Sequence, residues 1–168
     1  MRLTAIAILC VLAAVASARA KPFTGEGFYT LDIPEPWSAA PGSGPPMLVI
    51  RRSGAEYRGA IILVSLATSK KPLDETLAGA AYGDTLSDKQ ERTVDGAPCL
   101  TAKRTSTKDF VADVLMCSVV FQQAGAEKAV IFGITSTSTN AQYADQHAAF
   151  EAVVQSVKWA PGTTPGPR

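Results

Sequence analysis

Residues 89–121 read KQERTVDGAPCLTAKRTSTKDFVADVLMCSVVF, and this stretch decides the fold. Asp95-Gly96 stands between two runs of strand-forming residues, Lys89–Val94 and Ala97–Thr105. A two-residue Asp-Gly link between such runs is the strongest short-range signal for a β-hairpin. A third run, Phe110–Phe121, follows a short polar connection. The stretch therefore predicts three consecutive antiparallel strands.

The length of the polar connection sets the register of the second and third strands. If Thr107–Asp109 form a three-residue loop, Cys99 lies directly opposite Cys117, and Lys103 lies opposite Asp113. A connection one residue shorter would move the cysteines to opposite faces, because side chains alternate along a strand. The pair of opposite charges supports the first register. We therefore predict a Cys99–Cys117 disulfide, with two free buried thiols as the alternative.

The N-terminal segment, residues 1–20, has the organisation of a secretory signal peptide. Arg2 provides the positive start, Leu3–Val15 the apolar stretch, and Ala18-Arg19-Ala20 a cleavage site before Lys21. The apolar stretch is shorter than the roughly 20 residues that a membrane span needs. We therefore expect cleavage and export.

Two alternatives to cleavage stay open, an uncleaved anchor and a lipid attached to Cys10. After cleavage, no later segment approaches the length of a membrane span, so the mature chain is expected to be periplasmic or secreted. Only Cys99 and Cys117 then remain, in an oxidising compartment where paired cysteines commonly form disulfides.

Composition narrows the class of protein. The chain has 168 residues, with 16 Lys and Arg against 15 Asp and Glu, and loss of Arg2 and Arg19 with the signal leaves it near neutral. A nucleic-acid binder is excluded, because such proteins need a surplus of basic residues on one face. A hydrophobic content of 46% with 18% charged residues excludes a disordered chain. The length fits a single domain over residues 21–160.

The rest of the pattern predicts four more strands and two helices. The strands are Phe28–Ile33, Met47–Arg52, Gly59–Thr68 and Glu127–Thr135. A short helix begins near Pro72, and a longer one runs from Asn140 to Val157. The apolar stripe of the longer helix recurs at steps of three and four residues and consists of Tyr143, His147, Phe150, Val154 and Val157.

Seven strands and two helices then follow in the order βββαβββα. Several strands are apolar on both faces, so both faces of the sheet need cover. We predict an α+β fold with one antiparallel seven-stranded sheet and helices packed on both faces, an α/β/α sandwich. Residues 161–168 contain three prolines and two glycines, and we expect a disordered tail.

The segment from Pro34 to Met47 holds five prolines and is expected to be an irregular loop. Trp37 in this loop either fills the end of the core or presents its ring to a partner. Proline stiffness lowers the entropy lost on docking. The candidate residues for binding a protein partner are Trp37, Pro41, Pro45 and Pro46.

Two motifs and the order of the elements carry a resemblance. The segment FYTLDIPEPW (Phe28–Trp37) and the segment VQSVKW (Val154–Trp159) resemble the PsbP-like superfamily, which includes DcrB-like bacterial envelope proteins. The resemblance covers residues 26 to 159. Members are mostly binding and assembly modules without a shared active site. It therefore implies an exported, non-enzymatic protein-binding or assembly module of the bacterial envelope, and it carries over no catalytic residue.

Two other functions remain as alternatives. A small hydrolase would use His147, the single histidine, with Asp145 and one of the serines 118, 136 or 138. None of these serines has the glycine pattern of a nucleophile elbow, and the position of His147 in the apolar stripe favours a packed side chain. The other alternative binds a small apolar ligand between sheet and helix. We expect no metal and no cofactor, because zinc usually needs three or four clustered ligands.

Overall fold

The computed structural model describes residues 20–25, 27–42, 47–54, 60–69, 71–123 and 126–167. Apart from Ala20, the predicted signal peptide lies outside these residues. Its cleavage therefore stays a prediction.

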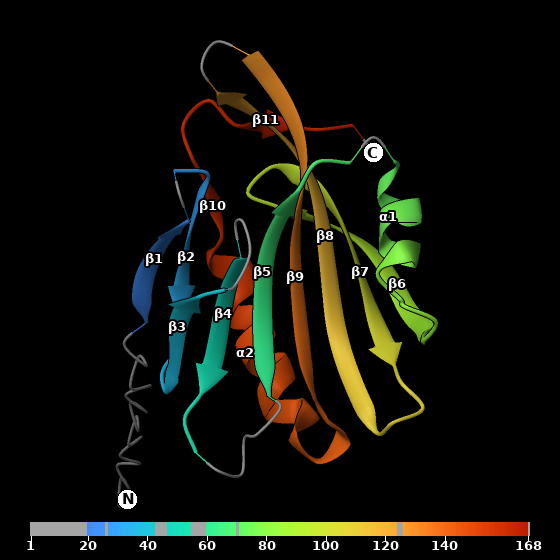
Figure 1. Cartoon of the computed structure of the whole chain (residues 1–168). Helices are drawn as coiled ribbons and strands as arrows, with labels where there is room; N and C mark the ends of the chain where they lie inside the picture. Colours follow the sequence, from blue (N-terminus) through green and yellow to red (C-terminus); the bar gives the residue numbers. More distant parts are fainter. Residues whose placement is uncertain are drawn as a thin grey trace, which may run out of the picture.

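A large antiparallel sheet forms the body of the molecule (Figure 1). Its strands lie in the spatial order β3-β4-β5-β9-β8-β7-β6, so the stretch that predicted three consecutive strands forms one side of the sheet. The bounds are β3 Trp37–Pro41, β4 Met47–Arg52, β5 Ile61–Ala67, β6 Thr85–Val94, β7 Ala97–Thr105, β8 Phe110–Gln123 and β9 Ala126–Thr139. The short strand β11, Thr164–Pro165, also pairs with β8.

A smaller sheet has the order β1-β2-β10. Its strands are β1 Lys21–Gly25, β2 Tyr29–Ile33 and β10 Lys158–Trp159. Alternate residues of β2, Tyr29, Leu31 and Ile33, are buried and belong to the main hydrophobic core. They face helix α2, Tyr143–Ser156, which packs against both β2 and β9. The helix is therefore held by both sheets.

The predicted count of seven strands in one sheet is wrong. All seven predicted strands are present, but β1, β3, β10 and β11 were not predicted. Strands β1 and β3 each contain a proline and lie at a sheet edge, where alternation of apolar residues is weak. Strands β10 and β11 have two residues each, which is too short to show a period. The predicted irregular loop from Pro34 to Met47 contains β3.

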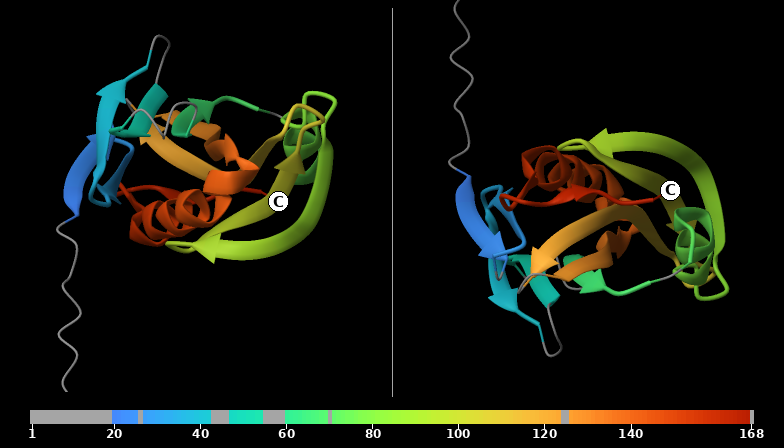
Figure 2. Two further views of the ribbon diagram at one scale, coloured as in Figure 1. Left: turned by 90° about the horizontal axis from the view of Figure 1, so that it is seen from below. Right: turned by 90° about the horizontal axis from the view of Figure 1, so that it is seen from above.

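Helix α2 covers one face of the large sheet, here called the inner face. Phe150 and Val153 of α2 are buried in one cluster with Leu115 of β8 and Phe132 of β9. The sheet bends round this helix (Figure 2). The inner face therefore carries the main core of the protein.

Helix α1, Leu73–Gly79, lies on the opposite face, here called the outer face. Its Leu77 packs with Ala102 of β7 and Val114 of β8, which alternate with the residues that face α2. Helices on both faces were predicted, but α1 has seven residues and packs only on β7 and β8. The outer face over β3, β4, β5 and β9 is therefore not covered by a helix of the described residues.

The buried side of α2 differs from the predicted stripe. Phe150, Val154 and Val157 are buried as expected, but the side chain of His147 is 47% exposed and Tyr143 is half-buried. The other buried residues of the helix are Gln146, Ala149 and Val153. The side-chain amide nitrogen of Gln146 donates to the carbonyl oxygen of Ile61 at 3.1 Å. Because Gln146 is polar, the sequence pattern did not indicate that it lies on the buried side of α2.

The tail from Pro161 was predicted to be disordered, and the structure shows ordered backbone instead. Thr164 and Pro165 pair with Val120 and Val119 of β8, and the amide of Gly166 donates to the carbonyl oxygen of Ser118 at 3.0 Å. The edge of β8 supplies the partners for these hydrogen bonds. The composition of the tail does not show that such an edge lies beside it.

The Asp95-Gly96 turn joins β6 to β7 as predicted. Both residues have positive φ, 45° and 86°, as a two-residue turn of this kind requires. The Asp95 carboxylate also accepts hydrogen bonds from the Trp159 amide at 2.8 Å and the Lys158 ammonium at 3.0 Å. These two bonds, the backbone one first, lower the pKa of Asp95 below its usual 3.8. One turn residue therefore also anchors β10.

We predict that Asp95→Asn lowers the free energy of unfolding at neutral pH, and that the difference from the unaltered protein becomes smaller in acid. A carboxyl group whose pKa is depressed by folding stabilises the folded state above its usual pKa, and this contribution is lost as pH falls through the folded-state pKa. Asparagine tolerates the positive φ, so the turn is kept. Urea unfolding of both proteins between neutral pH and the acid limit of folding measures the difference. A deficit that does not change with pH would contradict the anchoring role.

Candidate functional site

The predicted disulfide joins β7 to β8. Cys99 lies directly opposite Cys117 with a Cα–Cα distance of 4.0 Å, and Lys103 lies opposite Asp113. The three-residue connection and its register are therefore confirmed. Both cysteines are buried in the inner-face core, at 3% and 0% exposure. The crosslink acts as a structural brace and not as an exposed redox site.

Trp37 fills the end of the core. It is the first residue of β3, its residue exposure is 6%, and it belongs to the cluster that includes Phe150. Its backbone amide donates to the carbonyl oxygen of Pro34 at 2.8 Å, which closes the turn between β2 and β3. Of the two roles considered for Trp37, the structure supports the core role, because a buried ring has no face to offer a partner.

Pro41 is exposed at the end of β3, beside a hollow of about 310 Å³. The hollow is lined by Ser38, Ala40, Pro41, Gly42, Val49 and Arg51. Pro45 and Pro46 lie outside the described residues. Pro41 is thus the one predicted contact residue that the structure places on an accessible surface.

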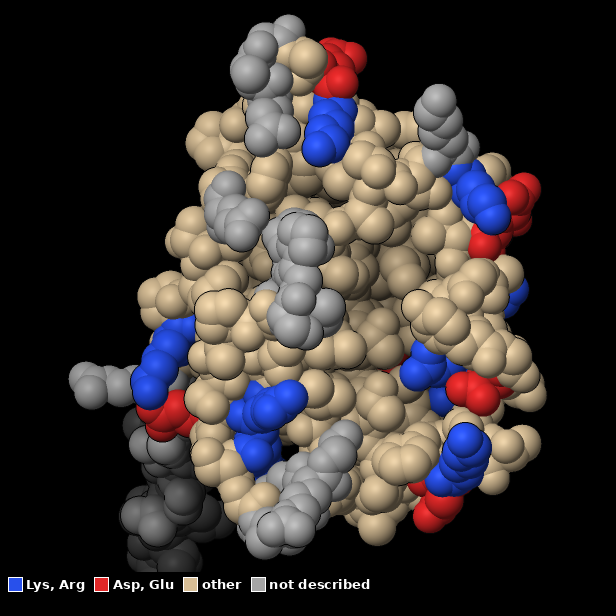
Figure 3. Space-filling model, viewed as in Figure 1, with Lys and Arg blue, Asp and Glu red and all other residues tan. Residues whose placement is uncertain are grey.

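A row of uncharged side chains crosses the outer face next to this hollow. Ala40 of β3 faces Val49 of β4, Val49 faces Leu63 of β5, and Leu63 faces Thr135 of β9. Ala40 is exposed, and the other three are half-buried. In Figure 3, which shows this side of the molecule, the charged side chains lie mainly towards the rim, and the described residues at the centre are uncharged. We call these four residues the outer-face row.

His147 makes a polar cluster with two other residues on the inner face. Its Nδ1 lies 2.9 Å from Oδ2 of Asp113, and the Tyr143 hydroxyl donates to Oδ1 of Asp113 at 2.8 Å. Tyr143 and His147 are four residues apart on α2, so both reach the same carboxylate. Asp113 on β8 is only 7% exposed. The cluster therefore fastens the first turns of α2 to the sheet.

Charge and burial in this cluster keep the Tyr143 phenol protonated. Burial first, and then the hydrogen bond to Asp113, raise the pKa of Tyr143 above its usual value of 10.0. The Lys103 ammonium lies 4.4 Å from the centre of the Tyr143 ring, a cation–π arrangement. These groups and residues of β6 line a polar hollow of about 290 Å³, in which Arg92 forms an ion pair with Glu151 at 3.0 Å.

The predicted Ser-His-Asp arrangement is only partly brought together. Asp113 takes the place beside His147 that was proposed for Asp145, whereas Asp145 pairs with Arg52 at 3.1 Å. Ser136 and Ser138 face the same side as His147 but are 1% and 0% exposed. Ser118 faces the outer side. The carboxylate and imidazole have the arrangement of an oriented base, but none of the three serines offers it an exposed hydroxyl.

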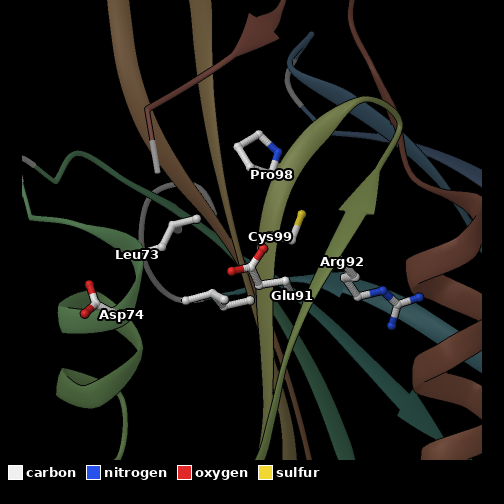
Figure 4. Close-up of a pocket in the computed structure, with 7 residues that line it drawn as sticks. Leu73, Asp74, Glu91, Arg92, Pro98 and Cys99 are labelled. Carbon is white, nitrogen blue, oxygen red and sulfur yellow. The ribbon is translucent and has the colours of Figure 1, made fainter.

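An apolar hollow of about 180 Å³ lies between α1 and the β6–β7 hairpin (Figure 4). Leu73 points into it from α1, and Pro98 and Leu100 line the sheet side. Arg92 points away from it, towards α2. Ligand pockets usually measure about 300–1,000 Å³. This hollow is the nearest match to the apolar-ligand alternative, and it is small for that role.

The described residues contain neither a candidate metal site nor a candidate membrane-spanning helix. No group of three or more His, Cys, Asp or Glu side chains among them is placed to hold a metal ion. No helix within the described ranges is long and apolar enough to cross a membrane.

Sequence reasoning missed Asp113 as the partner of His147 and missed the outer-face row. A signal for Asp113 exists, since it is an acidic residue inside the apolar strand VADVLMCSVV, and buried carboxylates need partners. The outer-face row carries no such signal. Its four residues come from four strands, and only the register brings them together.

The described strands and helices define the fold class of the protein. It is an α+β domain with a mostly antiparallel sheet, with α2 on the inner face and α1 on the outer face. Two solved structures resemble it. LpqN, described as involved in cell envelope biogenesis of Mycobacterium tuberculosis, matches with a TM-score of 0.59 and 15% identity over 85% of this chain and 91% of that chain. Cyanobacterial PsbP (CyanoP) from Synechocystis sp. PCC 6803 matches with a TM-score of 0.55 and 15% identity over 90% and 98%.

The chain therefore has the PsbP-like fold, as the resemblance implied. At 15% identity the two matches show the fold alone. They do not specifically support the DcrB-like branch. No family model and no curated protein matches the sequence.

We predict that the mature chain, starting at Lys21, has no free thiol when unfolded without reductant. Only Cys99 and Cys117 remain in that chain, and both are in the disulfide. Closing a separation of 18 residues should stabilise the fold by roughly 3 kcal/mol, so a double Cys→Ala variant should lose about that much. Thiol titration and urea unfolding measure these quantities, with the reduced protein as control. Two free thiols in the unreduced sample would contradict the prediction.

Proposed function

We propose that this chain is an exported, non-enzymatic module of the bacterial envelope that binds a protein partner, as an assembly factor or a neutralising binder. The contact surface is the outer-face row together with the hollow beside Pro41. The single observation that carries the proposal is the in-register row Ala40, Val49, Leu63 and Thr135 on a sheet face that no helix of the described residues covers.

The chemistry of this surface suits a protein partner. The outer-face row is uncharged, and depletion of charge is typical of the centre of an interface, while Arg51 in the lining of the hollow places a charge at its border. Backbone hydrogen bonds hold the strands beneath it, so little order is gained on docking. The partner that fits is a protein with an uncharged patch that follows the curved sheet face.

Pro41, in the proline-rich segment, borders the same surface. Pro41 lies in the wall of the hollow with Ala40, and Pro45 and Pro46 follow close in sequence. We propose that Pro41, Pro45 and Pro46 form one rim of the contact. Trp37 supports this rim from inside the core and does not touch the partner.

Export is supported by the signal-like segment, by the disulfide, and by the envelope role stated for LpqN. The hydrolase alternative is supported by the contact between His147 and Asp113. In the non-enzymatic reading this contact attaches α2 to the sheet. His147→Ala should then lower stability and leave partner capture unchanged.

We predict that Ala40→Lys abolishes partner capture without lowering the melting temperature. Ala40 is exposed, so a lysine there is tolerated, and surface substitutions usually change stability by within about 0.5 kcal/mol. Ala152→Lys is the matched control, because Ala152 is exposed on α2, on the other side of the sheet. The measurement is chemical crosslinking and affinity capture from the native envelope, together with thermal melting. Equal capture by the two variants would refute the proposed surface.

A further inference from the structure

Strand β8 has a stretch of edge that the strands of the hairpin do not cover. The pairing of β7 with β8 ends at Cys99 and Cys117, but β8 continues to Gln123. Along Ser118–Val120 the place of β7 is taken by the tail, residues 161–167, which crosses this end of the sheet as β11 (Figure 1). The tail thus supplies an added strand to an edge that would otherwise be free.

The tail approaches β8 most tightly at Gly166, which lies against Ser118. A Cβ atom at this position would lie 2.3 Å from the Ser118 hydroxyl oxygen and 2.9 Å from the Ser118 backbone carbon. Neither distance is possible for non-bonded atoms, and the second involves the backbone of a strand in the sheet. The edge therefore accepts an extended segment only if glycine stands opposite Ser118.

Beside this glycine the surface is hollowed. The hollow measures about 250 Å³ and includes Ser118, Val130, Ile131 and Lys71 in its lining. Pro167, the residue after the fitted glycine, lies at its wall. An edge that pairs with backbone and a neighbouring hollow that the next side chain borders are the two parts of a strand-addition site.

The tail is held mainly by backbone groups. Thr164 and Pro165 are exposed, and the amide of Thr163 bonds to the carbonyl oxygen of Ala160, which together with Gly162 at φ 85° forms the turn before the strand. A short strand with exposed side chains opens at low free energy. Because the tail is tethered, its effective concentration is on the order of millimolar, and a competing segment must overcome that.

We propose that the β8 edge at Ser118–Val120 is a strand-binding site that the tail occupies in the isolated chain. Its other occupant is an extended segment of a protein partner with glycine opposite Ser118, followed by proline or a similar apolar residue. This site is separate from the outer-face row, so the proposal stands or falls independently of the proposed function.

The test uses the full chain with Gly166→Ala, because the added Cβ atom would collide with Ser118 and displace the tail from β8. Gly79→Ala is the matched control, because a Cβ at Gly79 meets nothing within 4 Å. Amide hydrogen exchange at Val120, which pairs with Thr164, and at residue 166, whose amide donates to the Ser118 carbonyl oxygen, should be faster by about tenfold or more in Gly166→Ala. Exchange at both positions should be unchanged in Gly79→Ala. The amide of Phe132 in the core reports that the fold is intact. A synthetic peptide of residues 163–168 should then restore protection in the Gly166→Ala variant in a saturable manner.

Two further measurements test whether binding requires the glycine and whether the chain's own tail competes with the peptide. The same peptide with valine in place of its glycine should not restore protection. The unaltered chain, tested without any substitution, should bind the native peptide at least tenfold more weakly than Gly166→Ala does, because its own tail competes. Unchanged exchange in Gly166→Ala, equal effects of the two peptides, or equal binding of the native peptide by both proteins would overturn the proposal.

Discussion

The register between β7 and β8 is the constraint on which the rest of the structure depends. Cys99 opposite Cys117 puts both sulfur atoms on the inner face, and every second residue of the two strands follows them. A shift by one residue would exchange the faces, because side chains alternate along a strand. The disulfide makes such a shift impossible without breaking a covalent bond. This alignment sets which side chains of β7 and β8 enter the inner core, whereas the outer-face row follows from the pairings of β3, β4, β5 and β9.

The same alignment connects the hairpin to the end of the chain. The β6–β7 turn carries Asp95, which accepts the bonds that hold β10. Strand β10 completes the small sheet against β2 and directs the chain towards β8, where the tail pairs. The inner side of α2 is meanwhile attached at Asp113 by Tyr143 and His147. Strand β10, the tail and helix α2 therefore all contact the three neighbouring strands β6, β7 and β8 or the turn that joins two of them.

The sequence predicted most where the signal is local. An Asp-Gly turn, two cysteines and a three-residue loop were enough to predict the hairpin, its register and the disulfide. The sequence predicted least where position depends on other elements. Strand β3 contains a proline and small residues, and it is a strand because β4 offers an edge. The tail is ordered for the same reason, since β8 offers one. His147 was expected to be packed, but the polar Gln146 takes the buried position. Trp37 could be assigned to core or contact only when its burial was known.

We propose that a protein partner docks on the outer face, which no described helix covers over β3, β4, β5 and β9. The most direct measurement is photo-crosslinking in the living envelope from a light-activated amino acid placed at Ser65, an exposed residue of β5 on that face, and at Ala152 on α2 as the control. We expect one discrete crosslinked product from position 65 and none from position 152. A product from position 152 alone, or identical products from both, would contradict it.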